Sequence, residues 1–214
     1  MGDPCTGARL RELVAAHRPR GERETDARRR ILSELDRLDR PCEAGADPVH
    51  VTASAVVVGT RGTLLHMHRR LHRWMQPGGH IDPGEAPPEA ARRETLEETG
   101  LEVAHPPGGP LLLNVDVHEA ALGHTHLDLR YLVLGPAEDP APPPGESQEV
   151  RWFDWDAARA IADGALVDAL DAARELWQGH RAAWVRPGSA GPGSAGPGPD
   201  GPALDGPADR PEDQ

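Results

Sequence analysis

The sequence predicts a mixed α/β or α+β domain, because segments with strand and helix character alternate along the middle of the chain. A β-rich run at residues 49–58 is followed, after a Gly-containing turn, by a second strand at 63–68. Residues 88–99 have helical character, and two more strands are expected at 111–118 and 126–134. A chain of 214 residues fits one such domain with an appendage at either end.

The appendages differ in composition from the domain. Apolar residues at helical spacing predict helices at 8–17 and 25–39, the second with Thr25 as its N-cap. From Pro187 onward, 14 of the last 28 residues are Gly or Pro, which predicts a disordered tail without a packed core. We therefore expect three parts: a helical extension at 1–45, the folded domain at 46–184 and the tail at 185–214.

The domain is expected to close with a loop, a strand and two helices. Four prolines lie between residues 140 and 144, and a short strand is expected at 150–153. Helices are expected at 155–163 and 165–178. The longer one carries an apolar stripe formed by Leu166, Leu170, Ala173 and Trp177.

The charge balance limits the partners of the protein. With 23 basic and 35 acidic side chains the net charge is −12, which argues against nonspecific capture of nucleic acid or an anionic membrane. No apolar run of membrane-spanning length and no secretory signal are visible, so a soluble, cytoplasmic protein is expected. Cys5 and Cys42 have no metal-ligand spacing and are expected to be reduced thiols.

Three carboxylates share one face of the helix expected at 88–99. Glu94, Glu97 and Glu98 stand at i, i+3 and i+4, where like charges repel and destabilise a helix. Such a cluster makes sense when a hard divalent cation sits among the carboxylates, since Mg²⁺ favours oxygen ligands. Arg93, the neighbour of Glu94 in the sequence, can hold one carboxylate by a two-point contact. A metal-binding helix is therefore predicted.

Glycines permit the tight backbone path around this helix. Gly78, Gly79 and Gly84 belong to the loop that leads into the helix, and Gly100 stands where a C-terminal cap is expected.

The stretch GHIDPGEAPPEAARRETLEETGL resembles the Nudix box of the MutT-like Nudix hydrolases, written G-x5-E-x7-R-E-U-x-E-E-x-G-U, where U is a bulky aliphatic residue. Thr95 is the single departure, at a position where the family prefers Leu, Ile or Val. The resemblance extends over roughly residues 48–180 and excludes both appendages. The residues on pattern are Gly79, Glu85, Arg93, Glu94, Glu97, Glu98, Gly100 and Leu101.

The resemblance implies an α/β/α sandwich with a mixed sheet, and Mg²⁺- or Mn²⁺-dependent hydrolysis of a nucleoside diphosphate linked to another moiety. It implies a small nucleotide-type substrate, no stable nucleic-acid complex and, by analogy, a homodimer. It assigns metal ligation and catalysis to the three glutamates, with Glu94 the first candidate for general base. Arg93 joins the catalytic group and braces the loop–helix unit with Glu85. Glu146 and Glu149 stay open as bases from outside the box.

Two strands carry clues to the substrate. Alternation places Asn114, Asp116 and His118 on one face of the first strand, and His126, Asp128 and Arg130 on one face of the next. A shared face would form a polar wall for substrate groups, and its histidines with Asp116 could hold a further metal. A solvent-facing sheet surface is the alternative.

A basic cluster precedes the glycine loop. Arg69, Arg70, His72 and Arg73 could steer a phosphate toward the metal, or they could be ordinary solvated side chains. Trp74 could stack on a base, although packing is the simpler interpretation.

Two other functions stay open. A noncatalytic nucleotide sensor would share the fold but would not need all three carboxylates. A diphosphate isomerase would resemble enzymes that use a pocket cysteine, and no Cys follows Cys42.

Overall fold

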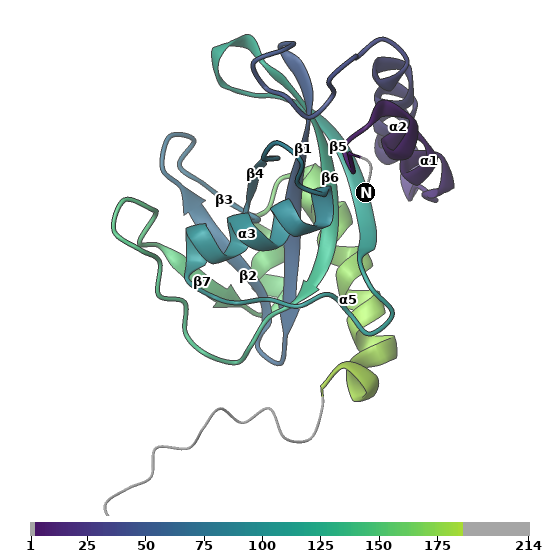
Figure 1. Cartoon of the computed structure of the whole chain (residues 1–214). Coiled ribbons are helices and arrows are strands. Elements are labelled where there is room, and N and C mark those ends of the chain that lie inside the picture. Colours follow the sequence, from purple (N-terminus) through teal and green to yellow (C-terminus); the bar gives the residue numbers. More distant parts are fainter. Residues whose placement is uncertain (1–2, 186–214) are drawn as a thin grey trace, which may run out of the picture.

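The computed structural model describes residues 3–185 and shows a mixed sheet covered by helices on both faces (Figure 1). This arrangement confirms the expected α/β/α sandwich. Among residues 3–185, no helix combines the length and the apolar character that crossing a membrane requires. The prediction of a disordered tail falls on residues 186–214, which lie outside the described part of the chain.

One sheet holds the seven strands of the described chain. They are β1 (Val49–Gly59), β2 (Gly62–His68), β3 (Arg73–Met75), β4 (Gly78–His80), β5 (Leu111–Glu119), β6 (Thr125–Leu134) and β7 (Val150–Phe153). The main order is β3-β2-β1-β6-β5, while β4 also pairs with β1 and β7 with β2. Only β1 and β6 run parallel among these pairs. This parallel pair forms the centre of the molecule.

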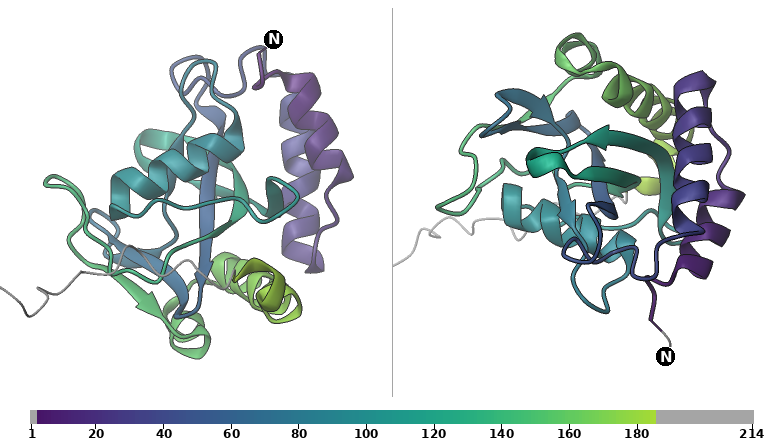
Figure 2. Two further views of the ribbon diagram at one scale, coloured as in Figure 1. Left: turned by 60° about the horizontal axis from the view of Figure 1, so that its bottom comes forward. Right: turned by 90° about the horizontal axis from the view of Figure 1, so that it is seen from above.

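The two faces of the sheet carry separate hydrophobic clusters, because successive side chains of a strand point to opposite sides. On β1, Val57 belongs to the cluster that includes helix α3 (Pro87–Thr99). Its neighbour Val58 belongs to the cluster built with α4 (Trp155–Ile161) and α5 (Gly164–Trp184). In Figure 2, α3 and α5 accordingly lie on opposite sides of the sheet.

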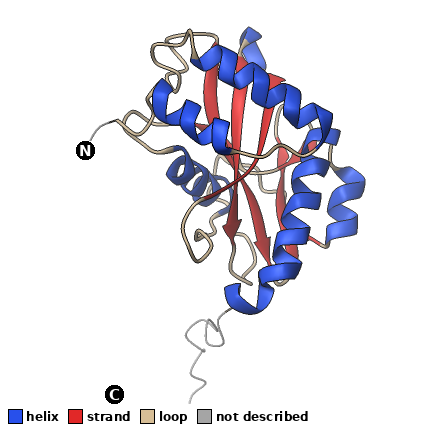
Figure 3. Cartoon of the chain, turned by 90° about the vertical axis from the view of Figure 1, so that its right-hand side faces the viewer, coloured by secondary structure: helices blue, strands red, loops and turns tan. Residues whose placement is uncertain are grey.

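The N-terminal extension forms two helices that pack along the β5 edge of the sheet, α1 (Gly7–Ala16) and α2 (Gly21–Leu35) (Figures 2 and 3). Ile31 of α2 is fully buried in the same hydrophobic cluster as the α3 face of the sheet. The predicted N-cap role of Thr25 is wrong, because this residue lies inside α2. Its hydroxyl donates to the carbonyl oxygen of Gly21 at 2.7 Å.

Glu24 attaches the extension to the domain through a polar contact. Its side chain is 2% exposed, and its carboxylate accepts a hydrogen bond of 3.0 Å from the backbone N–H of Val115 on β5. His17 and the backbone N–H of Arg20 contact the same carboxylate. Because β5 is an edge strand, this contact satisfies a backbone donor that would otherwise lack a partner.

Cys5 and Cys42 form a disulfide, so the prediction of reduced thiols is wrong. The helical hairpin brings together two cysteines that are 37 residues apart, with their Cα atoms at 6.2 Å, within the usual range for a disulfide. Spacing along the sequence could not reveal this approach, because it depends on how the two helices pack.

Candidate active site

Local sequence signals define the helix that carries the three glutamates. Pro87 and Pro88 open α3, where a missing N–H is tolerated. Gly100 ends it in the left-handed conformation with φ 72°, and its N–H donates to Leu96 at 2.8 Å. A side chain at Gly100 would also collide with the carbonyl of Ala141. The predicted helix and its glycine cap are therefore confirmed.

The carboxylates of Glu94 and Glu98 lie against the two glycines of β4, Gly78 and Gly79. The side chains of Glu94 and Glu98 are 16% and 18% exposed, whereas Glu97 is 56% exposed. Glu98 Oε2 accepts a hydrogen bond of 3.0 Å from the backbone N–H of Gly78. A Cβ at Gly79 would lie 2.7 Å from the carboxylate carbon of Glu94, so only glycine lets this carboxylate close on the turn.

Arg93 links the turn to the helix. Its guanidinium holds Glu85 through Nε at 3.1 Å and through NH2 at 3.0 Å, the two-point contact expected from the sequence. NH1 donates to Glu94 at 2.9 Å and to Glu97 at 3.1 Å. NH2 also donates to the backbone carbonyl of His80 at 2.9 Å. Arg93 thus balances part of the negative charge and fixes the loop against α3.

Two smaller details complete the loop. Gly84 has φ +80°, a conformation that other residues rarely adopt. The backbone N–H of Asp82 donates to Glu85 Oε2 at 3.0 Å. Both place Glu85 where Arg93 can reach it.

The electrostatics of the cluster favour capture of a cation. Burial raises the pKa of Glu98 to about 8, and the nearby charges of Glu94, Glu146 and Glu97 contribute to the increase against the opposing hydrogen bond from Gly78. Burial also raises the pKa of Glu94, although Arg93 opposes the change. Buried carboxylates with this little compensation gain most from a bound cation.

The three glutamates supply oxygen donors, the ligand atoms that Mg²⁺ and Mn²⁺ prefer. His66 Nε2 lies 3.8 Å from Glu98 Oε2. Glu94 and Glu98 present carboxylates beside the same glycine turn, and Glu97 accepts from the same NH1 of Arg93 as Glu94. The residues therefore fit the divalent cation that the resemblance implies.

The two external carboxylates differ in their surroundings. Glu146 lies in the loop before β7, and its charge helps to raise the pKa of Glu98. Glu149 forms an exposed ion pair of 3.5 Å with Arg151. Glu146 is therefore the external carboxylate that is tied to Glu98 by its charge, whereas Glu149 is tied to Arg151.

Thr95 occupies the core side of α3, where the box expects an aliphatic residue. It is fully buried, and its hydroxyl donates to the carbonyl of Ala91 one turn earlier at 2.7 Å. The hydroxyl is thus satisfied within the helix, and the acidic face is unaffected.

The predicted polar wall forms on the α5 face of the sheet. The pairing sets Asn114 opposite Arg130, Asp116 opposite Asp128 and His118 opposite His126. Asp116, Asp128 and Arg130 are 7%, 3% and 4% exposed, so the alternative of a solvent-facing surface is wrong.

Arg130 organises this wall. Its NH2 donates to Asp116 at 2.8 Å and its Nε to Asp128 at 3.1 Å. Its NH1 donates to the carbonyl of Ala165, the second residue of α5, at 2.8 Å. Asp128 further accepts from the hydroxyl of Ser54 on β1 at 2.8 Å. These side chains satisfy one another, and their contacts build the wall.

The basic cluster lies in the turn between β2 and β3. Arg69 and Arg70 are exposed, and Arg69 donates to the backbone carbonyl of Gly145. Arg73 approaches Asp163 at 3.9 Å. Trp74 packs edge-on against Phe153, with 4.8 Å between the ring centroids.

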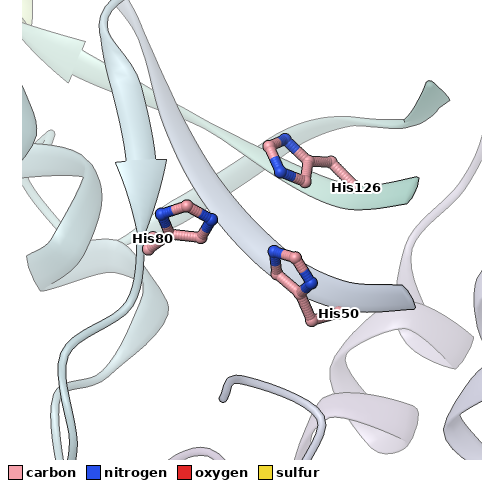
Figure 4. Close-up of side chains that lie close together, drawn as sticks. All are labelled: His50, His80 and His126. Carbon is pink, nitrogen blue, oxygen red and sulfur yellow. The ribbon is translucent and has the colours of Figure 1, made fainter. Parts of the chain in front are cut away.

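Sequence reasoning missed two histidines close to the site. One ring nitrogen of His50 on β1 and one of His80 at the end of β4 lie within 4.8 Å of a ring nitrogen of His126 (Figure 4). His80 stands directly after Gly79 within the motif and was visible in principle. His50 was not, because its approach depends on the parallel pairing of β1 with β6.

Comparisons with known proteins agree with this geometry. The family model for the NUDIX domain matches residues 48–171. A structure of a NUDIX-family hydrolase from Clostridium perfringens is 28% identical, covers 59% of this chain and 97% of that chain, and has a TM-score of 0.51. An Ap4A hydrolase complex from C. elegans, at 23% identity and a TM-score of 0.52, covers 60% of this chain and 98% of its own, and supports the fold.

Curated relatives match over shorter stretches. The chain is 51% identical over 41 residues to the asymmetrical bis(5'-nucleosyl)-tetraphosphatase of Mus musculus, and this match spans 19% of the chain and 28% of the relative. It is 27% identical over 183 residues to the NAD-capped RNA hydrolase NudC of Chromobacterium violaceum, a match that spans 79% of the chain and 64% of the relative. Because the family model covers more than half of the chain, the protein belongs to the Nudix family.

Proposed function

We propose that the protein is a metal-dependent hydrolase that cleaves the pyrophosphate linkage of a nucleoside diphosphate joined to another moiety. The observation that carries the proposal is the largely buried carboxylate of Glu98, which lies near Glu94, has a pKa raised to about 8 and accepts a hydrogen bond from the backbone N–H of Gly78. A buried carboxylate without a compensating positive charge lowers the stability of the folded state. Family membership supports the same chemistry.

Glu94, Glu97 and Glu98 would hold Mg²⁺ or Mn²⁺. When bound, the cation supplies neutralisation of phosphate charge and a water of lowered pKa. Arg93 orients Glu94 and Glu97 through NH1, and the N–H of Gly78 orients Glu98.

Two carboxylates compete for the role of general base. Glu94 is nearly buried and keeps a fixed position through Arg93. Glu146 reaches the cluster from a loop and acts on Glu98 through its charge. We favour Glu146 over Glu149 as the external candidate, because Glu149 is already paired with Arg151.

The phosphates of the substrate would lie at the glutamates, on the α3 face of the sheet, whereas the polar wall lies on the opposite face. His126 is half-buried and stays a candidate contact for another part of the substrate, whereas Asp128 and Arg130 are buried and shape the wall from within. Arg69, Arg70 and Arg73 would add positive charge at the β2–β3 turn for the phosphates. A homodimer and a cytoplasmic location stay predictions from the sequence.

The test is hydrolysis of a nucleotide panel by the full chain with Mg²⁺, Mn²⁺ or a chelator, with products identified by chromatography. The panel includes dinucleoside tetraphosphates and NAD-capped RNA, the compound classes named for two relatives. We expect turnover that requires the metal, is lost in Glu98→Gln and is kept in Glu102→Gln, whose carboxylate is exposed beyond α3.

The competing functions have their own signatures. Tight nucleotide binding without cleavage would indicate a sensor, and conversion of a diphosphate to its isomer would indicate an isomerase. Equal turnover in Glu98→Gln and the unmodified protein would overturn the proposal.

A further inference from the structure

Three imidazoles from three strands meet on the polar-wall face of the sheet. One nitrogen each of His50, His80 and His126 lies within 4.8 Å of the corresponding nitrogen of the other two (Figure 4). The pairing explains the meeting, since β1 sets His50 beside His126 on β6, and Thr52 of β1 pairs with His80. These residues are 30 and 46 positions apart, so the fold alone assembles the group.

His50 carries the second observation. The residue is fully buried, and its Nδ1 lies 3.3 Å from the backbone carbonyl of Asp47. That contact assigns the proton to Nδ1 and leaves a lone pair on Nε2. Nε2 is buried and has no hydrogen-bond partner, which costs about 1–3 kcal/mol for an ordinary polar group. A bound metal ion would use this lone pair.

We propose that His50, His80 and His126 form a site for a divalent transition metal such as Zn²⁺, separate from the glutamates of α3. Three neutral imidazoles suit Zn²⁺ and similar ions, whereas Mg²⁺ selects oxygen ligands. A carbonyl that accepts from the distal nitrogen of a metal-binding histidine is the usual support of such a ligand. A fourth coordination position stays open for water or a substrate group.

The two sites share β4 but use opposite sides of it. Gly79 faces the carboxylate of Glu94, and the next residue, His80, faces the polar wall, because successive residues of a strand alternate. Arg93 holds the backbone carbonyl of His80 at 2.9 Å, which couples the positions of the two sites.

The imidazoles must close slightly around the ion. Zinc–nitrogen bonds of about 2.0–2.1 Å in a tetrahedron place the nitrogens roughly 3.3 Å apart. His80 is exposed and His126 half-buried, so both rings can rotate toward the buried His50. Asp116, a ligand suggested by the sequence, is not available, because it pairs with Arg130 at 2.8 Å and with His118 at 3.0 Å.

The experiment titrates chelator-treated full-length protein with Zn²⁺ by calorimetry and with Co²⁺ by visible absorption. We expect one equivalent to give the intense bands of four-coordinate Co²⁺, distinct from any Co²⁺ that the glutamates of α3 hold. His80→Ala and His126→Ala should each weaken binding about tenfold or more, since even supporting groups have effects of this size. The control His180→Ala alters an exposed histidine on α5 and should leave affinity unchanged.

A second pair of variants separates this site from the proposed catalytic one. Glu97→Gln combined with Glu98→Gln should keep the Co²⁺ spectrum and the Zn²⁺ affinity. Circular dichroism on His80→Ala, which changes an exposed side chain, checks that the fold is intact. Absence of Zn²⁺ binding, unchanged affinity in both histidine variants, or loss of binding only in the glutamine variant would overturn the proposal.

Discussion

The carboxylates of Asp116 and Glu98 lie on opposite faces of the sheet, and their pKa values are shifted in opposite directions. Burial raises the pKa of Asp116, but His118 and Arg130 lower it by more, and the net pKa lies below the ordinary value. Burial raises the pKa of Glu98 to about 8, because this carboxylate faces one backbone N–H, neighbouring negative charges and the ring of His66, whose own pKa burial lowers to about 4. The partners of a buried acid, rather than its depth, therefore separate a structural carboxylate from one that is ready to bind a cation.

The largest expected effect on stability comes from removing the cation that faces Asp116, which would leave this carboxylate without a permanently charged partner of opposite sign, as Glu98 is. Arg130→Met leaves two buried carboxylates without their cation and should lower the free energy of unfolding by about 3–5 kcal/mol. Thermal and denaturant unfolding would measure the change. Arg159→Met is the control, because its ion pair with Asp171 is exposed and should contribute about 0–1 kcal/mol. Equal effects in the two variants would contradict a structural role for the wall.

The next effect concerns catalysis. Glu98→Gln should reduce metal-dependent kcat on the order of 10²–10³-fold, the scale for loss of a group that stabilises charge in a transition state. Steady-state hydrolysis measures this fall, and Glu102→Gln, which changes an exposed carboxylate beyond α3, is the matched control. A Glu98→Gln enzyme with normal kcat would remove the distinction between the two carboxylates.

The pH dependence of stability sharpens the same contrast. Without metal, the folded state holds a proton on Glu98 up to about pH 8, whereas the unfolded chain loses it near the ordinary glutamate pKa of 4.5. Folded protein then binds more protons in this window, so the free energy of unfolding should fall as pH rises from about 5 to 8. Glu98→Gln should lack this contribution. Its melting temperature, relative to that of the unmodified protein, should therefore rise as the pH increases toward 8. Parallel pH profiles would argue against the raised pKa.

Glu24 offers a third buried carboxylate, of the structural kind. Burial raises its pKa, but hydrogen bonds from His17 and the N–H groups of Arg20 and Val115 lower it by more. Glu24→Gln should therefore cost about 1–3 kcal/mol in the free energy of unfolding. The exposed neighbour variant Glu22→Gln should change it little. Chemical denaturation distinguishes them, and a neutral Glu24→Gln would show that the extension does not depend on this contact.

Thr95→Val should have the smallest effect. The change removes the hydroxyl bond to Ala91 and restores the aliphatic character that the box favours. Loss of one satisfied hydrogen bond and gain of a buried methyl group should nearly cancel, to within about 1 kcal/mol. Differential scanning calorimetry would measure the change in melting temperature. A larger change would mean that the hydroxyl of Thr95 contributes more than one ordinary hydrogen bond.

Local patterns in the sequence predicted the parts of the molecule that depend on nearby residues. The spacing of Glu94, Glu97 and Glu98 placed them on one side of α3, and the glycines placed the turn against that side. The long strands were predicted within a residue or so, whereas β3 and β4 have three residues each and carry no usable periodicity.

Contacts between distant segments could not be predicted in this way. The parallel pairing that sets His50 beside His126 depends on the order of strands in the sheet. The bond from Val115 to Glu24 joins residues 91 positions apart. The sequence suggested Asp116 as a metal ligand, because a pattern of alternating polar residues does not reveal that Arg130 pairs with it.

A crystal grown with Mn²⁺ and examined by anomalous scattering tests the cation site most directly. We predict a strong peak among the carboxylates of Glu94, Glu97 and Glu98, absent in Glu98→Gln. A crystal at saturating Mn²⁺ with no peak at these carboxylates would contradict the claim that this helix face exists to bind a cation.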